Sequence, residues 1–269
     1  MPFGLNTTLT MTTTRNRVVS LGVGQPISGG GFNVTRTQVG QPIGAFYVRH
    51  FAGIYQSAAE VTADCAHAPN AQPGDVRWAD LNGDCRIDDN DLHFAGSGIP
   101  KLEGRLYFEP RFGAFDAKLG FRGAWGAKIF NAVRYWASRT DDNGNHFADF
   151  RPWTPSNPSN STPRALYGAP GASNAFAASD AYLESGNYIR IQQLELGWRL
   201  PAAIGSGRFM LPTGQSRLYV AMNNLHTFTD YTGYDPEVLG FGDILNRGVD
   251  DGRVYPNVRT VTLGLSISQ

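Results

Sequence analysis

The sequence predicts an all-β fold: part of an antiparallel, up-and-down transmembrane β-barrel with long extracellular loops. Three observations predict it. Segments of about ten residues alternate apolar side chains with small or polar ones, as strands between lipid and a wet lumen do. Short and long connections between these segments alternate along the chain. Glycine and proline are frequent, at 32 and 16 of 269 residues, which favours strands and turns over helices.

Bulk composition limits the class of protein. The formal net charge is zero, from 23 basic and 23 acidic side chains, so the charge predicts no nucleic-acid partner. The chain has no run of about 18 apolar residues, so no transmembrane helix is predicted. Its start, MPFGLNTTLTMTTTRNRV, lacks the charged and apolar regions of a signal peptide. A membrane location therefore has to depend on strands.

The C-terminal stretch RTVTLGLSISQ is the clearest strand. Its apolar residues all fall on one face: Val261, Leu263, Leu265 and Ile267. Threonine, serine and glycine occupy the other face. A strand of a globular protein can alternate in this way too, but small uncharged polar residues suit the interior of a large barrel.

The same alternation predicts the remaining strands. In chain order they lie at 4–14, 32–39, 43–55, 104–125, 187–201 and 216–228. The segment 104–125 is long enough for a hairpin, with its turn between Gly113 and Phe115. In 187–201 the alternation changes face halfway, which predicts a β-bulge. The whole set, with the C-terminal strand, amounts to seven or eight strands.

The connections predict which end of the strands faces outward. Long ones are expected at 57–102, 130–186 and 228–256, tight ones at 40–43 and 113–115, and one of intermediate length at 201–216. Compact soluble domains rarely contain three such long loops, whereas outer-membrane barrels combine long outer loops with short turns on the opposite side. Strand parity places all the long loops at one end.

An acidic stretch in the first long loop, ADLNGDCRIDDNDLHF at 79–94, matches a twelve-residue calcium loop. The six predicted ligands are Asp80, Asn82, Asp84, Arg86, Asp88 and Asp91. Oxygen donors at alternate residues can surround one Ca²⁺, and the seventh position, Arg86, contributes its backbone carbonyl. The cofactor that this pattern predicts is Ca²⁺.

Two departures from the calcium pattern leave an alternative open. Cys85 stands where the loop normally has glycine, and Asp91 stands where it normally has glutamate. Aspartate at the last position occurs in extracellular dockerin-type loops, which this stretch resembles. The alternative is a turn in which Asp and Asn side chains cap backbone amides.

Other chemistry is sparse. Cys65 and Cys85 either form a disulfide in an oxidising compartment or are two unpaired thiols. The sequence spacing of the five histidines is not that of metal ligands. The histidines are His50, His67, His93, His146 and His226. Asp235 and Glu237 form a candidate acid/base pair, but such a pair in a loop is more typical of a structural turn. No enzyme activity is predicted.

Five blocks of sequence carry a resemblance to a known family. They are GGFNVTRTQVGQPIGAFY, PGDVRWADLNGDCRID, GNYIRIQQLELGWRLP, RLYVAMNNLHTFTDYTGYDPEV and YPNVRTVTLGLSIS. In this order and spacing they resemble the C-terminal part of the SusC/RagA family of TonB-linked, or TonB-dependent, outer-membrane transporters. The resemblance extends over about 30–268.

The resemblance implies both a fold and a function. It implies a barrel of about 22 strands around a plug, of which 1–269 would be the C-terminal part without the plug domain. It implies import of an oligosaccharide, peptide or other bulky nutrient through the outer membrane of a Gram-negative cell. The implied partners are a SusD-like surface lipoprotein, outer-membrane lipid and, through an N-terminal part, the TonB complex.

Two rival functions have their own signatures. A secreted Ca²⁺-binding β-domain for adhesion or carbohydrate binding requires a closed apolar core with polar residues outside. A surface glycoside hydrolase requires two carboxylates on either side of a cleft.

Overall fold

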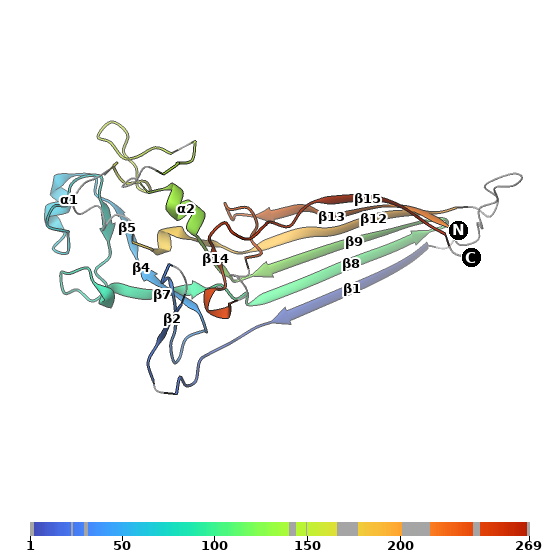
Figure 1. The fold of residues 1–269 in the computed structure, drawn as a ribbon, viewed down its shortest axis with the longest axis horizontal. Helices are drawn as coiled ribbons and strands as arrows, with labels where there is room; N and C mark the ends of the chain where they lie inside the picture. The colour runs from blue at the N-terminus through green and yellow to red at the C-terminus, as the bar shows by residue number, and fades with distance from the viewer. Residues whose placement is uncertain are drawn as a thin grey trace, which may run out of the picture.

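The computed structural model describes the chain in the ranges 3–22, 24–29, 32–139, 144–148, 150–165, 177–200, 216–238 and 243–267. Long strands make up one end of the molecule, and short strands, helices and loops make up the other (Figure 1). Within these ranges, no helix is both long and apolar enough to cross a membrane.

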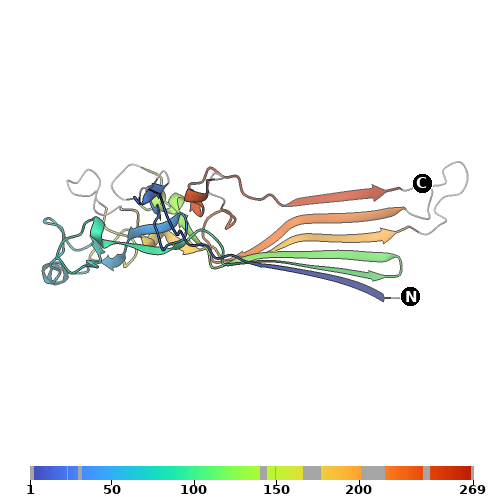
Figure 2. The ribbon, with the colours of Figure 1, turned by 90° about the horizontal axis from the view of Figure 1, so that it is seen from below.

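Six long strands pair in one antiparallel sheet, called the strand wall below. They are β1 (Phe3–Thr13), β8 (Leu102–Phe112), β9 (Phe115–Trp125), β12 (Tyr188–Arg199), β13 (Arg217–Thr229) and β15 (Thr260–Ser266). Their order across the sheet follows the chain. Figure 2 shows them running side by side away from the shorter elements. The antiparallel up-and-down fold class is confirmed.

Two local details of the strand wall confirm predictions. The hairpin between β8 and β9 turns through Gly113, whose φ of 59° lies in the left-handed region that glycine adopts without strain. The β-bulge in β12 is a register shift against β9 between Ile191 and Gln193, where Gln192 is the extra residue. Against β13 the register shifts at the same place, but there the extra residue lies on β13. An extra residue at this point moves the apolar side chains back to their original face.

The described residues of the long connections lie together at one end of the strand wall, called the loop end below (Figure 1). They are the segments 14–101, 126–187 and 230–259. The β8–β9 hairpin and the C-terminus lie at the opposite end, as strand parity predicts, and so does the N-terminus (Figure 1). The predicted tight turn at 40–43 lies at the loop end instead, between β3 and β4. The predicted connection at 201–216 lies outside the described residues except for its last residue, Ser216.

The predicted placement of 32–39 and 43–55 in the wall was wrong. These segments form β3 (Thr35–Thr37), β4 (Ala45–Arg49) and β5 (Phe51–Ile54). β3 and β4 belong to a separate sheet with β2 (Ile27–Gly29) and β7 (Leu92–Ser97), while β5 pairs with β6 (Val76–Trp78). Their apolar residues are core residues: Val34, Phe46 and Val48 are at most 1% exposed. Alternation alone does not distinguish a lipid-facing strand from one that covers a protein core.

The loop end is a folded unit with its own core. Its main cluster contains Val34, Phe46 and Val48 from the first connection, Phe130 and Ala132 from the second, and Val249 from the third. The remaining elements are α1 (Ala58–Ala63), η1 (Asp89–Asp91), β10 (Lys128–Asn131), α2 (Ala132–Ala137), η3 (Asp180–Tyr182), β11 (Leu183–Ser185), η6 (Ile244–Asn246) and β14 (Val249–Asp250). β10 pairs with both β11 and β14, which ties the second connection to the third. Burial of this shared apolar surface stabilises segments that are far apart in sequence.

Candidate functional site at the strand wall and its loop end

One face of the strand wall is apolar from edge to edge. The strand registers place Phe108, Leu119, Leu194, Met222 and Val261 in a single row across five strands. Side chains on this face are widely exposed; Leu263, for example, is 73% exposed. A soluble protein rarely leaves so large an apolar surface uncovered. The face therefore suits hydrocarbon as its surroundings.

An aromatic row borders this apolar face at the hairpin end. Cross-strand pairing aligns Phe3 with Phe112, Phe112 with Phe115, and Phe115 with Trp198. The Phe115 and Trp198 rings stack with centroids 6.3 Å apart. Aromatic girdles of this kind mark the membrane–water interface in barrels.

The opposite face of the wall carries charged side chains in ion pairs. Arg217 on β13 donates to Asp116 on β9 and to Glu195 on β12, with an Arg217 Nη2 to Glu195 Oε1 distance of 2.8 Å. Lys118 Nζ lies 3.3 Å from Glu109 Oε1 on β8. Paired charges of both signs are typical of a water-filled lumen surface. Alternation in the sequence of β9 places Asp116 and Lys118 on this face, but their ion pairs were not predicted.

A buried arginine anchors the third connection to the wall. The Arg190 side chain on β12 is 3% exposed and contacts Asp235 at 2.5 Å and Glu237 at 3.0 Å. Asn257 donates a side-chain hydrogen bond to Asp235 at 2.9 Å. Glu237 also contacts Arg122 on β9 at 2.5 Å. The candidate acid/base pair of the sequence is thus engaged by arginines, which is the arrangement of a structural anchor.

The electrostatic environment of Asp235 agrees with this role. Burial alone raises the pKa of its carboxyl group, but hydrogen bonds from the backbone N–H groups of Glu237 and Asn257 lower it. The Arg190 guanidinium lowers it as well, and the pKa is held below its usual value. A cleft of about 370 Å³ lies beside this anchor, and its lining includes Asp235, Tyr234 and Asn257.

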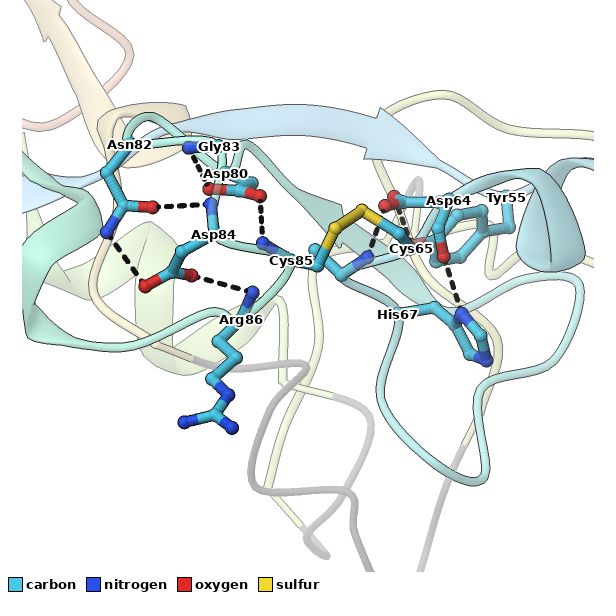
Figure 3. The surroundings of a disulfide bond; sticks show 11 residues. Tyr55, Asp64, Cys65, His67, Asp80, Asn82, Gly83, Asp84, Cys85 and Arg86 are labelled. Atoms are coloured by element: carbon cyan, nitrogen blue, oxygen red, sulfur yellow. Dashed lines mark hydrogen bonds between the residues drawn. A yellow bond between two sulfur atoms is a disulfide. The ribbon is translucent and has the colours of Figure 1, made fainter.

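Cys65 and Cys85 form a disulfide, which resolves the alternative that the sequence left open. Figure 3 shows the bond between the segment after α1 and the acidic stretch. Beside it, the Tyr55 hydroxyl donates to Asp64 at 2.7 Å. Burial, together with this carboxylate, raises the pKa of Tyr55. A disulfide in this position is typical of an oxidising compartment such as the cell surface.

The first half of the acidic stretch uses its side chains to cap backbone amides (Figure 3). Asp80 accepts from the N–H groups of Gly83 at 2.7 Å and Cys85 at 2.8 Å, and Asp84 accepts from that of Arg86 at 2.9 Å. Cys85 has φ of 62°, so it adopts the left-handed backbone for which calcium loops normally use glycine. The disulfide partner of Cys85 stabilises the loop in which this strained residue lies.

The second half of the stretch is organised by a buried carboxylate. Asp91 is 1% exposed, and it accepts from the N–H groups of Leu81 at 2.8 Å and Asp88 at 2.9 Å. Asp88 in turn caps η1 by accepting from Asn90 at 2.7 Å. The five predicted side-chain ligands therefore accept from backbone amides of their own loop, as in the alternative interpretation. Calcium binding by this loop stays a prediction.

Other proteins are similar to this chain in both sequence and fold. It is 30% identical to TonB-dependent receptor P3 of Formosa agariphila over 98% of its own length. It is 28% identical to TonB-dependent receptor P26 of the same organism over 99%. The chain belongs to the TonB-dependent receptors. It spans about a quarter of the length of these curated relatives, 27% of each. It matches no protein-family model.

The fold of this TonB-dependent receptor segment agrees with solved structures. It superposes on a structure of the RagAB peptide transporter with a TM-score of 0.73 at 19% identity, covering 98% of this chain and 27% of that one. RagAB in a "closed-closed" state gives a TM-score of 0.72, also at 19% identity and with the same coverage. These solved structures confirm the barrel fold that the resemblance implies.

Removal of two predicted calcium ligands provides a direct test of the acidic stretch. In the purified receptor, Asp80→Ala combined with Asp84→Ala is expected to abolish the heat of Ca²⁺ binding in calorimetry, because both carboxylates are predicted to contribute oxygen ligands. The control is Asp89→Ala, which changes a 94% exposed carboxylate of the same stretch that is not a predicted ligand. Unchanged Ca²⁺ binding in the double variant would contradict the ligand assignment.

Proposed function

We propose that this receptor segment forms part of the wall and outer surface of a transporter in the outer membrane of a Gram-negative cell. The transporter imports a bulky nutrient, an oligosaccharide or a peptide, with energy from the TonB complex. The observation that carries the proposal is the strand wall, which is apolar across one face and ion-paired across the other. Lipid on one side and a wet lumen on the other account for both faces.

The ion-paired face supports transport of a polar solute rather than catalysis. Arg217, Asp116 and Glu195 satisfy one another. In the same way Arg190 is satisfied by Asp235 and Glu237. Carboxylates that are paired with arginines in this way are poor candidates for general acids or bases, which need a pKa near the working pH and direct contact with the substrate. The segment thus has the properties of a scaffold for a solute path.

The loop end supports a surface partner. Three connections share one apolar core there, so they present an ordered outer surface rather than independent loops. The similar solved structures are of a peptide transporter named RagAB. We infer that a SusD-like lipoprotein covers this end of the receptor and that TonB acts on a part of the receptor other than this segment.

Uptake by cells with and without the receptor tests the proposed function. A strain that lacks the receptor gene is expected to lose uptake of one class among labelled oligosaccharides and peptides, and the intact gene is expected to restore it only when TonB is present. The receptor should fractionate with the outer membrane. A receptor recovered in the soluble medium, with uptake unchanged by its deletion, would favour the secreted calcium-binding domain instead.

A further inference from the structure

Two histidines and an aspartate converge at the loop end, although they are far apart in the sequence. His50 lies between β4 and β5, His93 lies on β7, and Asp180 is the first residue of η3. One ligand atom from each lies within 4.8 Å of the other two. The first two residues belong to the first connection and the third belongs to the second. The spacing of the histidines in the sequence provided no signal for this group.

Backbone pairing, rather than side-chain flexibility, brings the three residues together. Val48 on β4 pairs with His93 on β7, which places the β4–β5 junction beside that histidine. Arg49 forms an isolated bridge with Ser179, one residue before Asp180. All three ligand positions are therefore fixed by strand contacts, so little ordering is required to bind a ligand between them.

The contacts within the group leave one carboxylate oxygen directed at both imidazoles. Asp180 Oδ2 lies 2.5 Å from His50 Nδ1 and 3.6 Å from His93 Nε2. The other oxygen, Asp180 Oδ1, accepts a hydrogen bond of 2.8 Å from the Phe51 backbone N–H. A hydrogen bond of this type to the second oxygen orients a metal-binding carboxylate. The imidazole rings stand nearly perpendicular, at 87°, with centroids 5.5 Å apart.

One of the two distances agrees with tetrahedral coordination, and the other requires a small separation of the side chains. Nitrogen and oxygen ligands bind Zn²⁺ at about 2.0–2.2 Å, which places neighbouring ligand atoms about 3.3–3.5 Å apart. The 3.6 Å separation already agrees with this spacing, and the 2.5 Å separation has to open by roughly 0.8 Å. The side chains are 48%, 31% and 21% exposed for His50, His93 and Asp180, so an ion can reach them from solvent. His93 Nδ1 is buried and forms no hydrogen bond within the described residues.

We propose that His50, His93 and Asp180 bind a divalent transition-metal ion of the Zn²⁺ class and that this ion cross-links the first and second connections. Two neutral imidazoles and one carboxylate are a common ligand set for Zn²⁺, with a water molecule in the fourth position. The single negative charge of the set favours a divalent cation. The site is outside the strand wall and does not depend on transport by the receptor.

Metal titration of the detergent-purified receptor tests the site. After treatment with a chelator, the parent receptor is expected to bind one equivalent of Zn²⁺ by calorimetry. With Co²⁺ it should show the intense visible absorption of four-coordinate cobalt bound to nitrogen and oxygen. His93→Ala and Asp180→Asn should each weaken Zn²⁺ binding at least tenfold and remove the cobalt band. Asp180→Asn keeps an oxygen that can accept from Phe51 N–H, so it preserves the local fold.

A matched control separates this site from adventitious binding. His67→Ala removes a histidine of the same loop end that is not a member of the group. It should leave both the Zn²⁺ affinity and the cobalt spectrum unchanged. Zn²⁺ binding of equal affinity in the parent and in Asp180→Asn, or a folded parent receptor that binds no Zn²⁺, would overturn the proposal.

Discussion

Replacement of Arg190 by alanine is expected to lower the free energy of unfolding by about 3–5 kcal/mol. The Arg190 side chain is 3% exposed and is shared by Asp235 and Glu237. Without Arg190, two largely buried carboxylates lose a positive partner in the folded state. The resulting loss of stability is larger than the net contribution of the ion pairs in the intact receptor. Urea-induced unfolding of the detergent-purified receptor measures the change, with heat-modifiable migration as the signal for the folded barrel.

An arginine at the other end of the same strand is the matched control. The Arg199 side chain is 53% exposed and lies 3.9 Å from Asp116. Exposed ion pairs of this type contribute about 0–1 kcal/mol, so Arg199→Ala should have little effect. Similar losses in the two variants would show that burial of Arg190 does not anchor the third connection.

The Arg190 effect should also depend on pH. Because the pKa of Asp235 is lowered in the folded receptor, the ionised carboxylate favours folding at all pH values above its ordinary unfolded pKa. This contribution is lost as the pH falls through the lowered folded-state pKa. The difference in stability between Arg190→Ala and the parent should therefore decrease in acid. A difference that grows in acid would contradict the anchor.

Leu119→Arg is expected to destabilise the barrel by about 2–4 kcal/mol and to reduce the folded fraction in lipid. Leu119 lies in the middle of β9, on the apolar face, between Phe108 and Leu194. An arginine at this depth brings a charge into hydrocarbon, where no water satisfies it. The fraction of heat-modifiable receptor after folding into lipid vesicles measures the effect.

The neighbouring residue is a control on the opposite face. Lys118 is already a cation on the ion-paired face, with Glu109 at 3.3 Å. Lys118→Arg introduces an arginine next to position 119 in the sequence, but on the face that we expect to meet water. The folded fraction should therefore be unchanged. If Leu119→Arg folds as well as Lys118→Arg, the apolar face does not contact lipid.

Much of the wall follows from local sequence. In β15 and β9, alternation alone identified the strand, its two faces and the hairpin turn. This succeeded because the side-chain period of a strand is two residues and each face has a single environment. The bulge in β12 was predictable for the same reason, since it appears as a break in that period.

Alternation failed where both environments are apolar. The segments 32–39 and 43–55 have the pattern of wall strands, yet Phe46 and Val48 face a protein core at the loop end. Apolar side chains are favoured both against lipid and in a protein interior, so the sequence pattern is the same for both. Only the pairing of β4 with β7, which is distant in sequence, decides between them.

The acidic stretch was predicted in part from the sequence. Its oxygen-rich spacing and the proximity of Cys65 and Cys85 were visible in sequence. Formation of the disulfide depended on the fold, because a bond requires two Cα atoms within about 7 Å. In the structure they are 5.1 Å apart.

The sequence by itself determined the antiparallel class, the two-faced strands and the end at which the long connections gather, because these depend on residue periodicity and strand parity. Only the tertiary structure decided that Arg190 binds Asp235 and Glu237, and that His50 and His93 meet Asp180. Such contacts join residues from separate connections. Their geometry is set by long-range strand pairing and a shared core, which no local pattern records.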